Sequence, residues 1–227
     1  MYIDTTYLLF MLFVMALGGL AQFFIHSQYR KYDKVASMTG LTGAQMARHM
    51  LDANGLSHLP VQMIAGTLTD NYNPRSTVVS LSQAVYNGRS VSAIAIACHE
   101  CGHAVQYAQK YLPATVRNAT WPVVNLVSNL WYLVLMVGFM LSVLEIVWAA
   151  LLMFCVVLLY QLITLPIEFN ASSRALAFIN PGGYLPTGDS DGARAVLTAA
   201  ALTYVAGALA SILQLVYLFS RTNRRRS

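Results

Sequence analysis

Charged residues are scarce in this chain. Asp, Glu, Lys and Arg make up only 10% of its 227 residues, while 57% are hydrophobic; soluble domains contain about 25% charged residues. An ordinary soluble domain is therefore excluded. The apolar residues form runs long enough to cross a bilayer, at residues 7–25, 121–144, 146–167 and 195–220. The sequence predicts a mainly α membrane protein with about four transmembrane or membrane-embedded helices.

Cysteine is also rare. The chain has three cysteines, too few for a disulfide framework and compatible with a reducing compartment. Cys98 and Cys101 have the C-x-x-C spacing of a redox pair or a zinc knuckle. On a helix, however, Cys98 points about 100° away from His99, and no second cysteine pair exists. Small packing residues are therefore the preferred interpretation.

The most informative motif is an H-E-x-x-H sequence at residues 99–103. On a helix, His99 and His103 lie one turn apart on the same face, so both imidazoles can reach one metal ion. Glu100 follows the first histidine and is placed to act on a water molecule at that ion. Two histidine ligands, an open position and a carboxylate base are the arrangement of zinc proteases.

The surrounding residues favour a buried helix. Ser90 is a predicted N-cap, and an uncharged stretch leads from it into the motif. Gly102 is costly inside a helix, which indicates close packing at that point. The alternative is a structural helix with two hydrogen-bonded histidines. It is disfavoured because a glutamate beside two histidines is expensive to bury without a function.

Two histidines leave a zinc ion short of a third protein ligand. Among the carboxylates, Glu168 stands out because it ends the third apolar run, and an ionisable residue at a membrane boundary is a functional candidate. The alternative is an interfacial glutamate near Arg174. The remaining histidines precede the motif and read more simply as surface or interface residues; they are His26, His49 and His58.

Polar residues just after Glu168 are candidates for supporting roles. Ser172 lies four residues on, on the same helical face, and could hydrogen-bond a metal ligand. Asn170 and Arg174 could position substrate or stabilise an oxyanion.

At this point the chain resembles a known family. Residues 97–106 (ACHECGHAVQ) and 165–175 (LPIEFNASSRA), with 68–75 (LTDNYNPR) and 199–205 (AAALTYV), are similar to the YugP-like membrane neutral zinc metallopeptidases of bacteria. The resemblance covers nearly the whole chain. More distantly, the layout resembles the HtpX-type membrane proteases, where a glutamate after a transmembrane hairpin completes the site.

The resemblance implies one catalytic Zn²⁺ ion on His99, His103 and Glu168, with Glu100 as general base. Two departures are relevant: relatives carry other small or apolar residues at the two cysteines, and the HtpX-type proteases usually have Asp where Ser172 stands.

The apolar runs divide the chain into five parts. Residues 1–25 read as a retained transmembrane anchor, because no basic segment precedes the run and no small-residue cleavage site follows it. Residues 26–120 form a small α+β, zincin-like catalytic segment. A transmembrane hairpin at 121–167, a third-ligand helix and loop at 168–194, and a membrane helix with a basic tail at 195–227 follow.

Within the catalytic segment, the pattern predicts a helix at residues 44–53 and two hairpin strands at 61–68 and 77–81, joined by a turn at 70–75. A strand edge near the zinc helix could bind an extended peptide. Asp191 is a predicted cap of the last helix.

Basic residues indicate an orientation, although not uniformly. Arg30, Lys31 and Lys34 follow the first apolar run, and Asp4 is the only charge before it. The positive-inside tendency then places the catalytic segment in the cytoplasm of a multi-pass protein of the bacterial cytoplasmic membrane. The basic tail at 221–226 disagrees: it breaks the rule, the last run does not cross fully, or the protein is inverted. Membrane-surface anchoring explains the tail more simply than nucleic-acid binding, and no nucleic-acid partner is expected.

Two functions remain open. The first is a membrane-embedded zinc endopeptidase that acts on protein or peptide substrates associated with the lipid bilayer. The second is a catalytically silent zinc-binding membrane scaffold; the intact Glu100 argues against it, because a structural zinc site needs no base. The physiological substrate and the oligomeric state cannot be read from the sequence.

Overall fold

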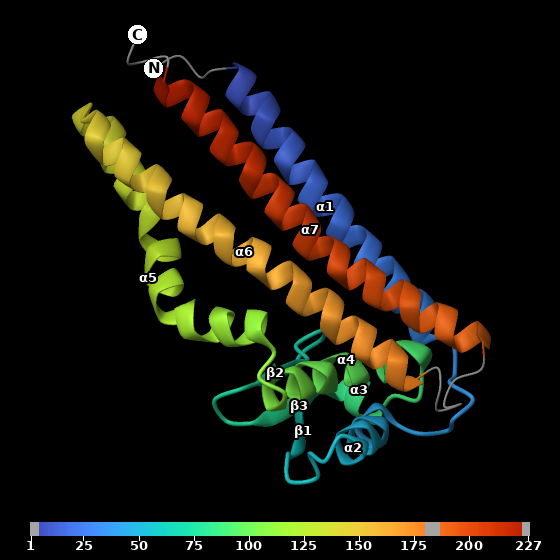
Figure 1. The fold of residues 1–227 in the computed structure, drawn as a ribbon. Coiled ribbons are helices and arrows are strands. Elements are labelled where there is room, and N and C mark those ends of the chain that lie inside the picture. The colour runs from blue at the N-terminus through green and yellow to red at the C-terminus, as the bar shows by residue number, and fades with distance from the viewer. Residues whose placement is uncertain (1–4, 180–186, 224–227) are drawn as a thin grey trace.

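The computed structural model describes residues 5–179 and 187–223. A bundle of long helices stands on a small catalytic segment at one end (Figure 1). Within the described residues, four helices are long and apolar enough to cross a membrane. They are α1 (Thr5–Asp33), α5 (Leu112–Leu141), α6 (Leu144–Ile179) and α7 (Thr187–Asn223). The expected mainly α membrane protein is confirmed.

The start of α1 and the end of α7 lie at the end of the bundle away from the catalytic segment, and α7 runs beside α1 over its length (Figure 1). The last apolar run therefore extends the full length of the bundle instead of stopping partway. Its start differs from expectation: α7 begins at Thr187, so Asp191 lies inside the helix and does not cap it.

Helices α5 and α6 form the expected hairpin, closed by a tight turn in which Ser142 has a positive φ of 55°. Helix α5 begins at Leu112, well before the apolar run that predicted it. Its first turns lie across the end of the bundle, and the helix then bends along α6 (Figure 1). Pro122 lies inside α5, and an interior proline kinks a helix because it lacks an N–H and clashes with the preceding turn.

The catalytic segment contains a three-stranded sheet in the order β1-β3-β2. Strand β1 (Val61–Ile64) pairs in parallel with β3 (Val78–Ser82), and β2 (Asn71–Asn73) pairs antiparallel with β3. The expected hairpin between residues 61–68 and 77–81 is therefore wrong. Part of the expected turn at 70–75 is β2, because Asp70 accepts hydrogen bonds from the backbone N and Oγ of Ser82 and holds this segment against β3.

Helix α2 (Gly43–Ala53) agrees with the helix predicted at residues 44–53, and it starts at a capping box formed by Thr42 and Gln45. Helix α3 (Gln83–Asn87) leads into the motif helix α4 (Val91–Ala108). The Oγ of Ser90 accepts the N–H of Ala93 at 3.1 Å, which confirms the predicted N-cap.

Helix α4 is the centre of the catalytic segment. It packs against α2, α6 and α7, and its small apolar side chains join one core with residues of those helices and β3. Burial on several sides explains why its non-motif residues are almost all apolar. The arrangement fixes the histidines of α4 at the point where α6 leaves the bundle.

Candidate metal centre

His99 and His103 lie on successive turns of α4, with ring centroids 4.7 Å apart. Glu168 reaches them from α6: its Oε2 lies 3.3 Å from Nε2 of His99 and 3.6 Å from Nε2 of His103. All three ligand atoms lie within 4.8 Å of one another. A zinc ion needs each donor at about 2 Å, so this two-nitrogen, one-oxygen set fits one ion with an open position.

Close contact between α4 and α6 makes this convergence possible. A Cβ atom on Gly102 would lie 2.6 Å from the carbonyl oxygen of Ala171. Glycine at 102 therefore lets the two backbones approach, and this is the close packing that the sequence indicated. Glu168 lies one turn before Ala171 and is carried to the imidazoles by the same contact.

Each imidazole makes a hydrogen bond through Nδ1, the ring nitrogen that faces away from Glu168. Ser172 Oγ lies 3.1 Å from Nδ1 of His99, and Gln106 Oε1 lies 3.1 Å from Nδ1 of His103. The Gln106 amide also donates from Nε2 to the carbonyl of Ile167 at 2.8 Å. That bond fixes its orientation, so Oε1 accepts and Nδ1 of His103 carries the proton. Nε2 of His103 is left as a metal donor, and Nε2 of His99 is left as one when its Nδ1 donates to Ser172; such outer bonds orient metal ligands.

Asn170 and Arg174 occupy the interface between α6 and α4. Asn170 Oδ1 accepts bonds from Gln106 Nε2 at 2.9 Å and from Arg174 Nε at 2.7 Å. Arg174 Nη1 donates to Gln109 Oε1 at 2.7 Å. Neither residue lines the cleft at the histidines. Their polar groups join the two helices that carry the candidate ligands, and the contact with substrate expected from the sequence stays a prediction.

Glu100 lines the cleft and is only 8% exposed. Burial raises the pKa of its carboxyl group, and the neighbouring imidazoles of His99 and His103 oppose that rise. Within the described residues, its carboxylate accepts no hydrogen bond. A buried carboxylate with open acceptor positions beside two metal-type ligands is suited to accept a proton.

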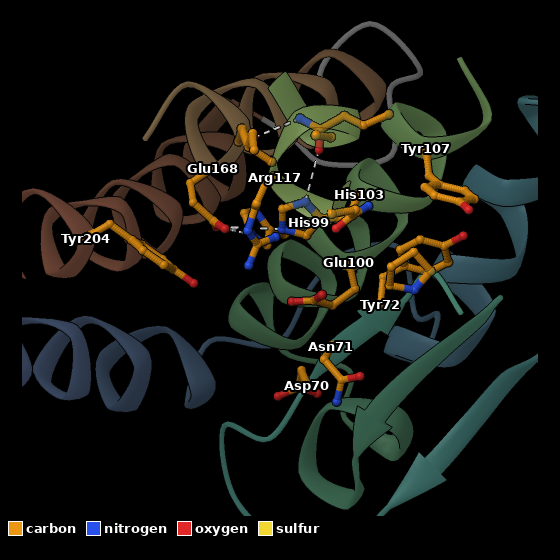
Figure 2. Close-up of a pocket in the computed structure, with 15 residues that line it drawn as sticks. Asp70, Asn71, Tyr72, His99, Glu100, His103, Tyr107, Arg117, Glu168 and Tyr204 are labelled. Atoms are coloured by element: carbon orange, nitrogen blue, oxygen red, sulfur yellow. Dashed lines mark hydrogen bonds and ion pairs between the residues drawn. The ribbon is translucent and has the colours of Figure 1, made fainter. Parts of the chain in front are cut away.

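The cleft has a volume of about 180 Å³ and opens between α4, β2 and the first turns of α5. Figure 2 shows its lining side chains around the histidines and Glu168. Sequence reasoning missed several of these, including Asp70, Arg117 and Tyr204. Gln106 had a signal, because it follows His103 by three residues on the same helix. Asp70 and Tyr204 lie in segments that carry the family resemblance, whereas Arg117 lies in none of them.

The other histidines and the cysteines do not join the metal centre. His26 is on α1, His49 on α2 and His58 in the loop before β1, and among the described residues the candidate ligand group contains none of them. Cys98 and Cys101 are fully buried free thiols, and Cys101 Sγ donates to the carbonyl of Ala47 on α2. Burial raises both thiol pKa values, which supports the packing interpretation.

Comparisons with known proteins agree with this geometry. The sequence profile of a family described as "putative neutral zinc metallopeptidase" matches residues 7–223. A relative described as "putative membrane protease YugP", from Bacillus subtilis (strain 168), is 45% identical over 212 residues, which cover 92% of this chain and 94% of the relative. No solved structure matches the chain. Family and relative together support a zinc protease in a membrane. On these matches, the chain belongs to the neutral zinc metallopeptidase family.

Proposed function

We propose that this chain is a membrane-embedded zinc endopeptidase in which His99, His103 and Glu168 bind one Zn²⁺ ion. The observation that carries the proposal is the convergence of these three ligand atoms beside the buried, unbonded carboxylate of Glu100. All three residues line the cleft. A bound ion would therefore have protein ligands on one side and room for water and substrate on the other.

Zinc at this position supplies Lewis acidity, which activates water and polarises the scissile carbonyl. Glu100 accepts the proton of the attacking water and passes it to the leaving amine. Its buried position in the cleft beside the imidazoles places the carboxylate where it can accept that proton. Ser172 and Gln106 keep the imidazoles oriented throughout.

Space on both sides of the ligands supports an endopeptidase acting at the membrane. The cleft toward β2 and α5 is one side. A second cavity of about 170 Å³, lined mainly by apolar residues of α1, α4 and α7, reaches His99, Glu100 and Glu168 from the other side. A substrate chain can extend away from the scissile bond in both directions, and one direction lies between two apolar helices. Membrane-associated polypeptides fit this layout.

The catalytic end is proposed to face the cytoplasm. Arg30 and Lys31 lie in the last turn of α1, and Arg174 is near the end of α6, all at this end of the bundle. The basic tail begins at the opposite end, where Arg221 lies in the last turn of α7. The proposal follows the residues that flank the first span.

A silent zinc scaffold fits the site less well. Structural zinc is usually closed by four protein ligands, often cysteines. Cys101, next to Glu100 in the sequence, is a ligand type that could close such a set, yet its thiol is directed to the carbonyl of Ala47 on α2. A buried glutamate beside an open position also has no structural use.

The substitution Glu100→Gln tests the proposal. It keeps the size and shape of the side chain but replaces one carboxylate oxygen with an amide nitrogen and so removes the base; peptide cleavage should therefore fall by about 10²-fold or more. Zinc content, measured on the purified protein, should stay near the wild-type value. Glu145→Gln at the far end of α6 is the matched control and should leave both values unchanged. Full activity in purified Glu100→Gln would refute the mechanism.

A further inference from the structure

A further hollow, separate from the two described above, continues from the metal cleft along the outside of α5 and α6. It has a volume of about 670 Å³, and we call it the arginine groove. Its lining residues are Tyr72, Asn73, Pro74, Arg75, Tyr107, Arg117, Asn118, Trp121 and Tyr160. The metal cleft shares five of these residues with it: Tyr72, Pro74, Tyr107, Arg117 and Asn118. A chain bound at the metal centre can therefore run directly into the groove.

The groove lining carries positive charge, and its Arg117 also lines the metal cleft that holds Asp70, Glu100 and Glu168. Arg75 and Arg117 line it, and no Asp or Glu is among its described lining residues. The Nε atom of Arg117 is buried without a hydrogen-bond partner among the described residues. Its guanidinium lies 5.9 Å from the ring centre of Tyr160, a contact that does not use the N–H donors. A buried guanidinium donor lacking an acceptor is best satisfied by an anionic group that enters from the groove.

Aromatic rings provide the rest of the lining. Tyr72 and Tyr107 form a tilted pair with ring centres 6.1 Å apart, and Trp121 and Tyr160 form another at 5.9 Å. Ring faces take up apolar side chains and peptide backbone with little entropy cost. The groove thus combines a flat apolar lining with two fork-shaped cation donors.

We propose that the arginine groove binds the part of the substrate on one side of the scissile bond and selects an acidic side chain flanked by apolar residues. Arg117, at the junction with the metal cleft, pairs with the carboxylate, and Arg75 strengthens the attraction from the rim. This inference rests on the proposed peptidase function and names its substrate class. Continuity with the metal cleft favours a peptide over an anionic lipid headgroup, which would gain nothing from reaching the ligands.

Binding without cleavage tests the inference directly. Full-length protein carrying Glu100→Gln is placed in phosphatidylcholine nanodiscs and titrated with amidated, fluorescein-labelled peptide pools. The pools contain apolar and aromatic residues with a single Glu or a single Gln at each position in turn. The best Glu pool should bind about tenfold more tightly than its Gln counterpart, as expected for a charge-assisted bidentate pair.

Substitutions assign the preference to the groove. Adding Arg117→Gln to the Glu100→Gln protein should remove most of the preference for Glu pools. Adding Arg117→Glu instead should produce a preference for matching pools that contain a single Lys. Arg89→Gln is the matched control, because Arg89 is exposed and does not line the groove; it should keep the preference. If the Arg117 variants fail to fold, Arg75→Gln, at an exposed position, should still reduce the preference by a few-fold.

The outcomes separate this inference from the proposed function. Equal binding of Glu and Gln pools, together with cleavage of both by the wild-type protein, would overturn the acidic preference and leave the peptidase intact. Retention of phosphatidylglycerol by the purified protein is measured as well. If Arg117→Gln loses this lipid, and the Glu100→Gln protein shows no preference between Glu and Gln peptides, the groove is a lipid site and the acidic preference is overturned. Failure of wild-type protein to cleave any pool would count against the peptidase, while the binding preference would remain measurable.

Discussion

At the residue scale, Gln106 is the least expected part of the metal centre. It is almost fully buried and bonds to Nδ1 of His103 while its amide nitrogen bonds to α6. It therefore orients a candidate metal ligand and joins the two helices that carry the candidate ligands. Arg174 and Asn170 extend the same network to the surface of α4.

Gln106→Ala should weaken zinc binding by roughly 10- to 100-fold, the usual effect of removing a partner of a metal-bound histidine. Competition with a zinc-binding dye measures the change in dissociation constant. Gln83→Ala, at an exposed position at the start of α3, is the control and should have no effect. An unchanged dissociation constant in Gln106→Ala would show that His103 keeps its orientation without this bond.

Glu168→Ala should lower zinc occupancy strongly, because it leaves only two protein ligands for the ion. Metal analysis of the purified protein after dialysis gives the stoichiometry. Glu145→Ala provides the comparison, since it removes a glutamate from the other end of the same helix. Equal zinc content in Glu168→Ala and wild type would reject Glu168 as a ligand.

At the element scale, the crossing of α4 and α6 controls the geometry of the centre. Gly102→Ala would place a methyl group 2.6 Å from the backbone of Ala171, so the helices must separate. We expect a lower Tm and weaker zinc binding together, because Glu168 moves with α6. Gly207→Ala on α7, where nothing lies within 4 Å, should be neutral or stabilising by up to about 1 kcal/mol. Thermal unfolding and zinc titration of both variants check this, and parallel behaviour of the two would contradict it.

The helical elements and the motif were predictable because they depend on local pattern. The apolar runs, the cap at Ser90 and the close contact at Gly102 are each visible within a few residues of sequence. The sheet was not predictable. Strands β1 and β3 are neighbours and pair in parallel, although β2 lies between them in the sequence, and strand patterns do not encode such a long-range pairing. The start of α5 was missed because its first turns are not uniformly apolar.

The candidate site likewise contains residues that local sequence predicts and residues that only the tertiary packing brings in. His99, Glu100 and His103 follow from spacing on one helix, and Glu168 from its place at a membrane boundary. Arg117 and Tyr204 line the cleft from α5 and α7, and only the packing of the bundle brings them there. Asn170 and Arg174 show the converse: their residue types suggested substrate contact, yet the contact between α6 and α4 takes up their polar groups.

At the scale of the whole molecule, the fold makes the orientation testable with two positions. Position 89 is exposed on the catalytic segment, and position 223 is exposed at the far end of α7. In protein with all three native cysteines replaced by alanine, a cysteine at 89 should be protected from a membrane-impermeant reagent added outside intact cells. A cysteine at 223 should be labelled. The reverse pattern would invert the proposed orientation, and protection of both positions would show that α7 does not cross.

The position of Glu168 beyond the α5–α6 hairpin has a consequence for biosynthesis. When α4 leaves the ribosome, the nascent chain holds His99, Glu100 and His103 but not Glu168, the proposed third ligand. On the proposed ligand set, α5 must pass into the bilayer and α6 must return before Glu168 can meet the two imidazoles. We therefore expect a stalled or wrongly inserted chain to lack a complete zinc site, so that cleavage activity would depend on completed membrane integration.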